Sequence, residues 1–232
     1  MSCEVKLIAA TADATRVVAA AAKLCYSASR ASDLYDGLDA DKVKNFLRQL
    51  RSVGHMSPFE HASFTFAIDG LSRVASHQLV RHRIASFSQQ SQRYVTMGAP
   101  CAVVPDEIAK NPEATALFER AANESHAAYE RLVAMGVPKE DARFILPHGW
   151  ETSLVMTMNA RELNHFFALR LCRRAQWEIR CLARKMLALV RESSPELFDP
   201  TGPSCVAEGR CREAHPCGQP YESVEALLVS DD

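Results

Sequence analysis

The spacing of polar and apolar residues in a few short segments constrains the fold of this chain more than any other feature of its sequence. Residues 62–68 (ASFTFAI) alternate with the period of two that puts every second side chain on one face of a strand. Residues 4–10 and 152–158 are also strand-like in composition. Helical spacing dominates between these segments. The pattern predicts an α/β or α+β fold, with a sheet flanked by helices.

Amphipathic helices account for most of the remaining chain. Val43, Leu47 and Leu50 illustrate their spacing, because residues at i, i+4 and i+7 share one helix face. The predicted helices cover about residues 12–27, 40–53, 71–83, 112–134, 138–146, 160–171 and 175–192. Asn159, with Glu162 three residues later, has the pattern of a capping box at the start of the sixth of these helices. Three segments are expected to be non-helical, namely a turn at 54–61, an ordered loop at 86–90 and an extended segment at 92–97.

The chain is predicted to contain one domain. No internal repeat and no linker precedes about Pro200, so residues 1–198 form that domain, with a mixed or antiparallel sheet, and residues 199–232 form an irregular tail. A chain of 232 residues, 47% of them hydrophobic, can bury a core without disulfides or metal ions. It has no apolar run of about 18 residues, and its start does not resemble a secretion signal. We expect no membrane segment and a cytoplasmic location.

Charge is segregated along the chain although its total is close to zero. The formal net charge of −1 argues against a nucleic-acid partner, which usually requires a basic excess. Yet Gly70–Pro105 contains four arginines and no Asp or Glu, and residues 163–191 contain six arginines and a lysine beside one acid, Glu178. The planar guanidinium of arginine matches phosphate and carboxylate oxygens. The two segments therefore predict sites for small anions.

The densest group of candidate functional residues lies in the first acid-poor segment. In a helix over residues 71–83, Gln78, Arg81 and His82 would share one face, and Arg83 would point elsewhere. Two adjacent arginines arranged in this way can serve two different anions. Spacing alone also allows a solvated basic helix end, which the helix dipole favours, or a module that binds nucleic-acid phosphates.

Two further arginine groups also suit anions. Ser91 and Arg93, two residues apart in an extended segment, would place a hydroxyl beside a guanidinium on the same side. Arg161, His165 and Arg170 lie on an apolar helix with few acids nearby. Because an unpaired buried charge is very costly, this helix is expected to have an anionic ligand as its partner.

Two histidines and a glutamate in residues 55–61 raise the question of a metal site. Their spacing matches no helical zinc motif, and Pro58 prevents an HExxH-like helix, so we predict no metal here. A hydrogen-bonded turn is the simpler interpretation. A metal-dependent hydrolase built on His55, His61 and His82 is the alternative, and it would contain stoichiometric metal.

The cysteines fall into two groups. Five are expected to be buried reduced thiols, because they lie in regular helical or strand-like patterns. Cys205, Cys211 and Cys217 crowd with His215 into the tail, at spacings that no zinc ribbon or knuckle shows. The tail can hold a metal, form a redox-active thiol cluster or be a simple irregular segment, and the sequence leaves all three open.

One motif resembles a known family closely. Arg81-His82-Arg83, followed by seven residues and Ser91, is the complete signature of the flavin-dependent thymidylate synthases. The likeness covers roughly residues 5–198, in the order of that family. The segments that carry it are GHMSPFEHASFTF, HQLVRHRIASFSQQSQRYV, GVPKEDARFILP, MNARELNHFFALR and AQWEIR.

The resemblance implies that the chain converts dUMP to dTMP by reductive methylation. Methylenetetrahydrofolate would supply the carbon, NADPH the hydride, and bound FAD would carry that hydride. It also implies the fold of that family and a homotetramer whose active sites lie where subunits meet. A Rossmann glycine motif is not expected, because this family does not bind its cofactor on such a turn.

The resemblance also assigns roles to individual residues. Arg170 would be catalytic, because its guanidinium would stabilise negative charge on the uracil ring. The implied FAD ligands are His55, Ser57, Arg81, His82, Arg83, Gln89, Asn159, Arg161 and His165. The implied dUMP ligands are Gln78, Arg81, Gln89, Gln90, Ser91, Gln92, Arg93, Arg143 and Arg170. No metal ligand and no cysteine nucleophile is implied. Ser57 and Gln89 stand where some relatives have Thr and Glu.

Overall fold

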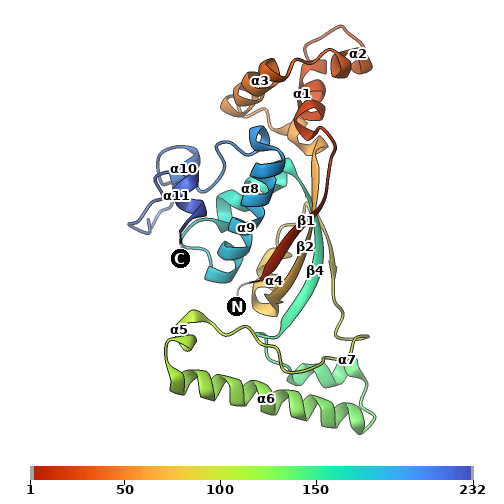
Figure 1. Cartoon of the computed structure of the whole chain (residues 1–232), viewed down its shortest axis with the longest axis vertical. Coiled ribbons are helices and arrows are strands. Elements are labelled where there is room, and N and C mark those ends of the chain that lie inside the picture. Colours follow the sequence, from red (N-terminus) through yellow and green to blue (C-terminus); the bar gives the residue numbers. More distant parts are fainter. Residues whose placement is uncertain (1–2, 231–232) are drawn as a thin grey trace. The chain divides into compact units, whose positions relative to one another are not determined.

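The computed structural model describes residues 3–230, apart from the side chains of residues 40 and 41. Four strands form one antiparallel sheet in the order β1-β2-β4-β3 (Figure 1). The strands are β1 (Glu4–Ala10), β2 (Ser63–Ser72), β3 (Ala85–Gln89) and β4 (Glu151–Asn159). Buried and partly exposed residues alternate along β2 and β4, which explains their strand-like spacing in the sequence. The predicted α+β class and antiparallel sheet are confirmed.

Helices flank this sheet. They are α1 (Ala14–Leu24), α2 (Ala31–Asp36), α3 (Ala40–Ser52), α4 (Arg73–Leu79), α5 (Asp106–Ala109), α6 (Pro112–Ala134), α7 (Lys139–Ala142), α8 (Ala160–Arg170), α9 (Trp177–Ser193), α10 (Ser204–Ala207) and α11 (Val224–Leu228). Single turns of 3-10 helix cover Ser57–His61, Arg143–Ile145 and Pro195–Leu197. None of the described helices is both long and apolar enough to cross a membrane.

The described residues form two compact units that interleave along the chain. The first contains the start of β1, Ile68–Arg81 and Ser88–Val155, and the second contains Val5–Ala67, His82–Phe87 and the chain from Met156 onward. The chain passes between them several times, so no single residue separates two sequential domains. The predicted division into residues 1–198 and a tail stays a prediction.

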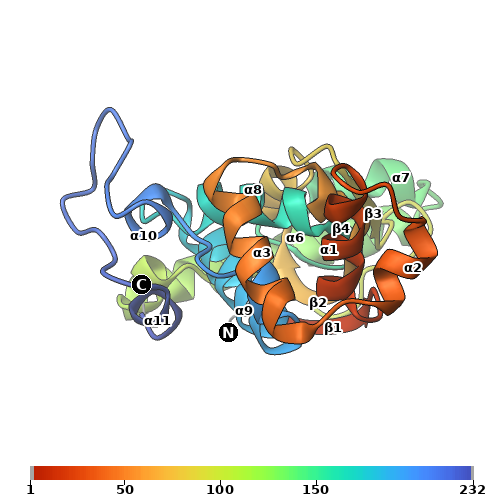
Figure 2. The ribbon, with the colours of Figure 1, turned by 90° about the horizontal axis from the view of Figure 1, so that it is seen from above.

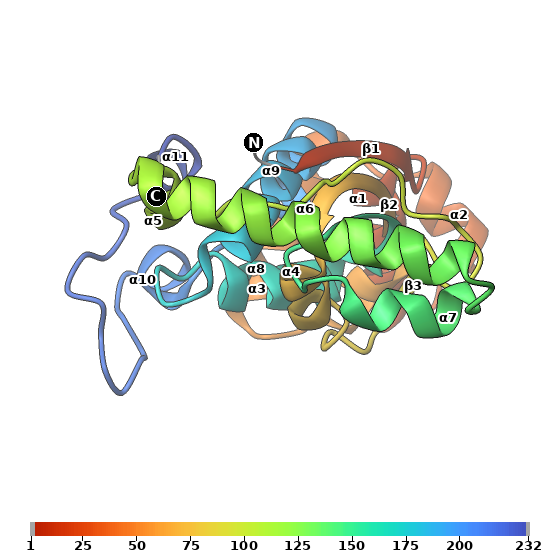
Figure 3. The same ribbon diagram turned by 90° about the horizontal axis from the view of Figure 1, so that it is seen from below.

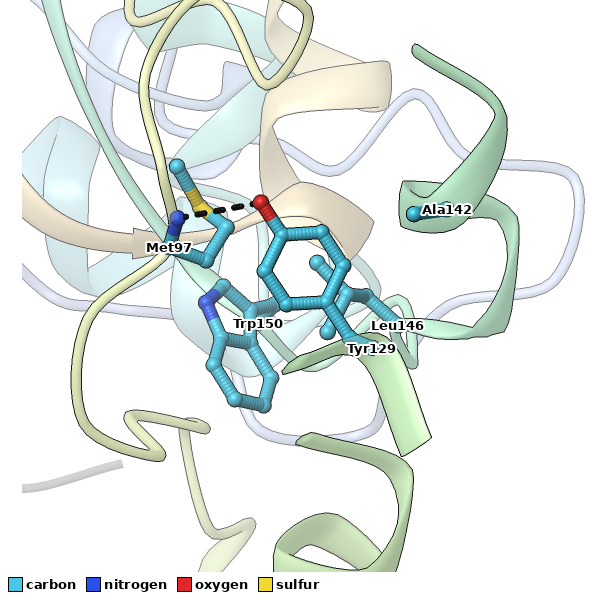
Figure 4. Packing of buried hydrophobic residues seen from close by; sticks show 5 residues of the cluster. All are labelled: Met97, Tyr129, Ala142, Leu146 and Trp150. Atoms are coloured by element: carbon cyan, nitrogen blue, oxygen red, sulfur yellow. Dashed lines mark hydrogen bonds between the residues drawn. The ribbon is translucent and has the colours of Figure 1, made fainter. Parts of the chain in front are cut away.

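The first unit is built around the long helix α6 (Figure 3). Asn111 caps this helix, since its Oδ1 accepts the backbone N–H groups of the first turn, and a proline follows at the first helical position. Tyr129 of this helix belongs to a cluster of buried residues (Figure 4), which comprises Met97, Tyr129, Ala142, Leu146 and Trp150. The Met97 backbone N–H donates to the Tyr129 hydroxyl at 3.4 Å, which satisfies the polar atom of a fully buried ring.

The second unit has an aromatic core. Phe64 of β2 meets Phe198 edge to face at 5.3 Å between ring centroids, and Phe167 of α8 meets Phe198 at 6.0 Å. Helices α8 and α9 lie side by side (Figure 1). Helix α1 contacts both α2 and α3 (Figure 2), and Leu47 and Leu50 of α3 are buried. These contacts fix α8 against the sheet strands of the same unit, and α8 carries several candidate site residues.

The structure corrects four local predictions. The helix expected over residues 71–83 covers only α4, because β2 extends to Ser72 and the Ser72 hydroxyl accepts the Ala75 backbone N–H as a helix cap. Residues expected to form a loop at 86–90 belong mainly to β3, and residues 92–94 form a turn rather than an extended segment. The turn expected at 54–61 ends in a 3-10 helix.

Candidate active site

Helix α8 begins at Asn159, and its first turn holds the most buried charged group of the candidate site. The Glu162 backbone N–H donates to Asn159 Oδ1 at 2.9 Å, as the capping pattern in the sequence predicts. The Glu162 side chain is buried and lies 3.0 Å, Oε1 to Nδ1, from the buried imidazole of His82. The helix start that the local sequence predicts therefore also places the Glu162 carboxylate against a histidine eighty residues away along the chain.

His82 connects Glu162 to Arg170. Arg170 Nε donates to His82 Nε2 at 3.0 Å, and a guanidinium can only donate. Nε2 must therefore be the accepting, unprotonated nitrogen, and Nδ1 must carry the proton that it donates to Glu162. The result is a carboxylate–imidazole–guanidinium chain that fixes one tautomer of His82 and the orientation of the half-buried Arg170.

The electrostatics of this chain favour a neutral histidine. Burial lowers the pKa of His82, the hydrogen bond to Glu162 opposes that change, and the positive charge of Arg170 lowers the pKa further. Burial also lowers the pKa of Arg170. Arg170 is therefore a partly desolvated guanidinium whose position is set by a neutral imidazole.

Two of these side chains, together with His165, form a group of three that is compact enough to hold a metal ion. The ligand atoms of His82, Glu162 and His165 all lie within 4.8 Å of one another. Both ring nitrogens of His82 already have hydrogen-bond partners, so the arrangement is better explained as a hydrogen-bonded chain. His55 and His61 are not part of this group, so the fold does not assemble the three histidines of the alternative hydrolase.

Arg161 does not fit the expectation of a buried charge that awaits a ligand. Its side chain is exposed and forms an ion pair with Glu60 of the 3-10 helix Ser57–His61. His165 is exposed as well. His55 is partly exposed and meets the Tyr26 hydroxyl through Nδ1 at 3.5 Å. The expectation was wrong for Arg161 because its acidic partner, Glu60, comes from a segment about a hundred residues earlier in the chain.

The two arginines that flank His82 are exposed. Arg81 and Arg83 have no ion-pair partner within residues 3–230, where side chains are described. They follow the end of α4, so Gln78, Arg81 and His82 do not share a helix face as the spacing predicted. Exposed guanidinium groups without acids nearby remain available for an anion.

In the first unit, β3 leads into the remaining candidate residues. Gln89 Nε2 donates to the Thr152 hydroxyl at 3.3 Å, and the Gln90 backbone N–H donates to the Ser153 carbonyl at 2.9 Å. The Gln90 carbonyl accepts from Arg73 Nη2 at 2.8 Å. The chain is therefore fixed by β4 up to the point where the signature serine begins.

Ser91 and Arg93 lie in a turn beside α7. The Arg93 backbone N–H donates to the Ser91 hydroxyl at 3.2 Å, and Arg93 Nε donates to Glu140 Oε2 at 2.8 Å. Glu140 raises the pKa of Arg93. Arg143 Nε donates to the Glu140 carbonyl at 3.1 Å. The predicted phosphate clamp is thus brought together with Arg143, but an anion would have to compete with the exposed carboxylate of Glu140.

Arg73 adds a second positive charge close to Arg143. Burial lowers the pKa of Arg73, and the charge of Arg143 lowers it further. Arg73 Nε is buried and has no hydrogen-bond partner among the described residues. A bound anion would offset the repulsion between the two guanidinium groups and would accept a hydrogen bond from the unsatisfied donor. This pair is the strongest sign of an anion site in the first unit.

Sequence reasoning missed four residues that organise these groups, namely Glu60, Arg73, Glu140 and Glu162. Three of them are acids that pair with predicted site residues. Arg73 was visible as one of four arginines in the acid-free segment, but no role was assigned to it. Glu162 lies three residues after the helix cap Asn159, and this spacing explained Glu162 as part of a helix start. The sequence therefore gave no sign of its contact with His82.

The comparisons with known proteins agree with the family resemblance. The family model described as "Thymidylate synthase complementing protein" matches residues 6–196. A flavin-dependent thymidylate synthase of Geobacter sulfurreducens is 51% identical over 223 residues, which cover 94% of this chain and 95% of that protein. One from Clostridium tetani is 45% identical, with 98% of each chain covered.

A solved structure resembles this fold as well. The crystal structure of the UMP/dUMP methylase PolB from Streptomyces cacaoi, bound with 5-Br dUMP, matches with a TM-score of 0.77 and 27% sequence identity. The match covers 86% of this chain and 94% of PolB.

Proposed function

The chain belongs to the flavin-dependent thymidylate synthase family, and from this premise we propose that it methylates dUMP to dTMP with bound FAD. Methylenetetrahydrofolate is the proposed carbon donor and NADPH the proposed reductant. The observation that carries the proposal is the Glu162–His82–Arg170 chain, because it joins the central histidine of the family signature to a guanidinium held in one position.

The residues of the second unit fit a flavin. A flavin dinucleotide presents a diphosphate and a ring with several acceptor atoms, so it needs cationic groups and donors. Arg83 is exposed and without an acidic partner in the described part of the chain, and His55 and His165 are accessible. Ser57 and Asn159 lie at the starts of a 3-10 helix and of α8. These groups, with Arg81 and Arg161, are the proposed ligands, and they match a diphosphate better than a metal ion.

FAD, when bound, supplies the hydride chemistry, and the chain orients the reactants. We assign to Arg170 the stabilisation of negative charge that develops on the uracil ring as carbon 5 becomes nucleophilic. A guanidinium never gives up its proton at neutral pH, so it acts by charge and hydrogen bonding rather than by proton transfer. Glu162 and His82 are positioning residues, since they hold Arg170 without touching the ring themselves.

The first unit is the proposed site for the phosphate of dUMP. Ser91, Arg93 and Arg143 are the proposed ligands, and Arg73 adds positive charge close to Arg143. Gln78, Arg81, Gln89, Gln90 and Gln92 complete the set that the family signature implies. PolB, with 5-Br dUMP bound, supports a uracil nucleotide as the ligand class.

We also propose a homotetramer with active sites between subunits. Large apolar side chains beside the proposed ligands are exposed, and they include Ile84 at 67%, Tyr94 at 75% and Phe144 at 85%. Such side chains are typical of surfaces that another chain covers. The cytoplasmic location stays a prediction from the sequence.

The test is a reconstituted reaction. Purified protein with FAD, NADPH, methylenetetrahydrofolate and dUMP should form dTMP, and omission of any one component should stop the reaction. Separation of the nucleotides by chromatography measures the product directly. Formation of dTMP without flavin, or no dTMP from a folded and flavin-loaded tetramer, would contradict the proposal.

A further inference from the structure

Three cysteines of the tail and one from the end of α8 gather at one place in the second unit. Cys172 follows α8, Cys205 lies in α10, and Cys211 and Cys217 lie between α10 and α11. All four are free thiols, and all four line one cavity of about 360 Å³. His215, which the sequence grouped with the tail cysteines, does not line it; its backbone carbonyl accepts from Arg174 instead. The group that the structure brings together therefore contains Cys172 from outside the tail and does not contain His215.

The loop that carries Cys211 and Cys217 is held by exposed polar contacts, such as those of Arg174 with Glu213 and with the His215 carbonyl. Residues 207–220 are all exposed, and residues 208–220 contain no helix or strand. Figure 2 shows this segment as a long loop that projects between α10 and α11. Ordering the backbone costs about 1–2 kcal/mol per residue, and no buried apolar side chain in this loop offsets that cost. A bound metal ion can supply this stabilisation, as it does in small metal-dependent folds.

Two of the four sulfurs have the hydrogen-bond environment of thiolate ligands. The Gln219 backbone N–H donates to Cys217 Sγ at 3.4 Å, and the Arg174 backbone N–H donates to the sulfur of Cys172. In both cases the donor lies two residues after the cysteine. Gly218, with a φ of 77°, permits the tight turn after Cys217. Donors of this kind stabilise a negatively charged sulfur over a neutral thiol.

Cys101 provides the contrast. Its Sγ donates a hydrogen bond to Glu151 Oε2 at 2.8 Å, and this bond raises the pKa of Cys101 to about 11. Such a sulfur stays protonated. A cation in the cavity would stabilise the thiolate form of the four sulfurs that line it.

We propose that Cys172, Cys205, Cys211 and Cys217 are the four thiolate ligands of a metal centre that fastens the C-terminal tail to the end of α8. Four thiolates select either a zinc ion or an iron–sulfur cluster. On binding, each thiol gives its proton to water and its sulfur bonds to the metal. The site lies outside the proposed residues for FAD and dUMP, so it does not depend on the proposed function.

The distances bear on which metal centre binds. No three of the four Sγ atoms lie within 4.8 Å of one another among the described residues. A single zinc ion, with bonds of about 2.3 Å, needs sulfurs about 4 Å apart, so zinc binding requires the four cysteines to move closer together. An iron–sulfur cluster would occupy more of the cavity and would tolerate wider spacing. Metal analysis distinguishes these two forms of the same thiolate site.

The experiment is metal analysis of the full chain, purified without oxygen from cells supplied with zinc and iron. We expect about one zinc per chain, or iron with an equal amount of acid-labile sulfide, and either result supports the thiolate site. Cys217→Ser and Cys205→Ser should lose at least about 80% of that metal. Cys101→Ser, an exposed cysteine that donates to a carboxylate, should retain it. Circular dichroism and flavin content verify that each variant is folded.

A second measurement needs no variant. Alkylation of the wild-type chain followed by peptide mass spectrometry should modify the exposed Cys25 rapidly, and the four cavity cysteines only after the metal is removed. Three results would overturn the proposal. They are less than roughly a tenth of an equivalent of zinc or iron in the folded wild type, a disulfide between any two of the four cysteines, or unchanged metal content in both tail variants.

Discussion

Replacement of Glu162 by Gln tests whether the buried chain of Glu162, His82 and Arg170 positions the catalytic guanidinium. Glutamine keeps the shape and an accepting oxygen 3.0 Å from His82 Nδ1, but it removes the charge. A hydrogen bond to a charged group contributes about 1.5–3 kcal/mol, and a neutral one about 0.5–1.5 kcal/mol. The difference between the two contributions, roughly 1.4 kcal/mol, corresponds to about a tenfold lower rate.

We therefore expect Glu162→Gln to lower kcat about tenfold, with a change in KM for dUMP of less than about threefold. Glu162→Ala should cost more, because it leaves the buried Nδ1–H without an acceptor at about 1–3 kcal/mol. That loss also frees His82 to adopt the other tautomer, in which Nε2 no longer accepts from Arg170. Steady-state kinetics with dUMP as the varied substrate measure both parameters.

A double-mutant cycle separates positioning from general destabilisation. If Glu162 acts through Arg170, Glu162→Gln should have little further effect in an Arg170→Lys background. Glu124→Gln, an exposed position on α6, is the matched control and should leave kcat unchanged. A wild-type kcat in Glu162→Gln, or a full tenfold loss that persists in the Arg170→Lys background, would refute the positioning role.

Four other tests probe separate parts of the molecule. Arg170→Ala should abolish turnover and leave FAD bound, and loss of flavin absorbance would show that its role is misassigned. Ser91→Ala should weaken dUMP binding in a KM measurement without any covalent consequence, so a seryl–nucleotide adduct in a mass spectrum would count against it. Burial lowers the pKa of His82 below its usual 6.5, so the unfolded state binds more protons than the folded state in mild acid. Urea unfolding at about pH 7.5 and 5.5 should therefore show that the wild type loses more stability than His82→Asn as the pH falls. Equal losses in the two proteins would contradict this. Leu47→Ala should lower the free energy of unfolding by about 2–5 kcal/mol, and Leu117→Ala, 57% exposed, by less than about 0.5 kcal/mol; similar losses in both would argue against the described packing.

Local signals in the sequence predicted most of the elements. The bounds of α6 were predicted correctly, because Asn111 and Pro112 mark its start and amphipathic spacing continues to Ala134. The cap at Asn159 and the strand before it were predicted for the same reason. Each of these features depends on residues within a few positions of one another.

Long-range pairing explains the wrong predictions. The segment Ala85–Gln89 is too polar to be recognised as a strand, and it pairs as one because β4 supplies a partner more than sixty residues later. Residues 71–72 continue β2 although their spacing is helical, since the buried Leu71 packs with the sheet. Local propensity is weaker than such tertiary contacts.

The candidate site shows the same division. The family signature identified His82, Arg170 and their neighbours, but it did not show which acids pair with them. Glu60, Glu140 and Glu162 lie 101, 47 and 80 residues from their partners. The tail cysteines stood out in the sequence, yet the participation of Cys172 required the fold that places the end of α8 beside the tail.

The most direct test of the central claim is the visible absorption spectrum of the purified protein supplied with FAD. A flavin-dependent enzyme should retain the flavin through gel filtration, and NADPH added without oxygen should bleach its absorption, with dUMP changing the rate. Methylenetetrahydrofolate and dUMP together should then restore the oxidised spectrum as dTMP forms. A folded chain that elutes without flavin, or flavin that NADPH does not reduce, would contradict the account.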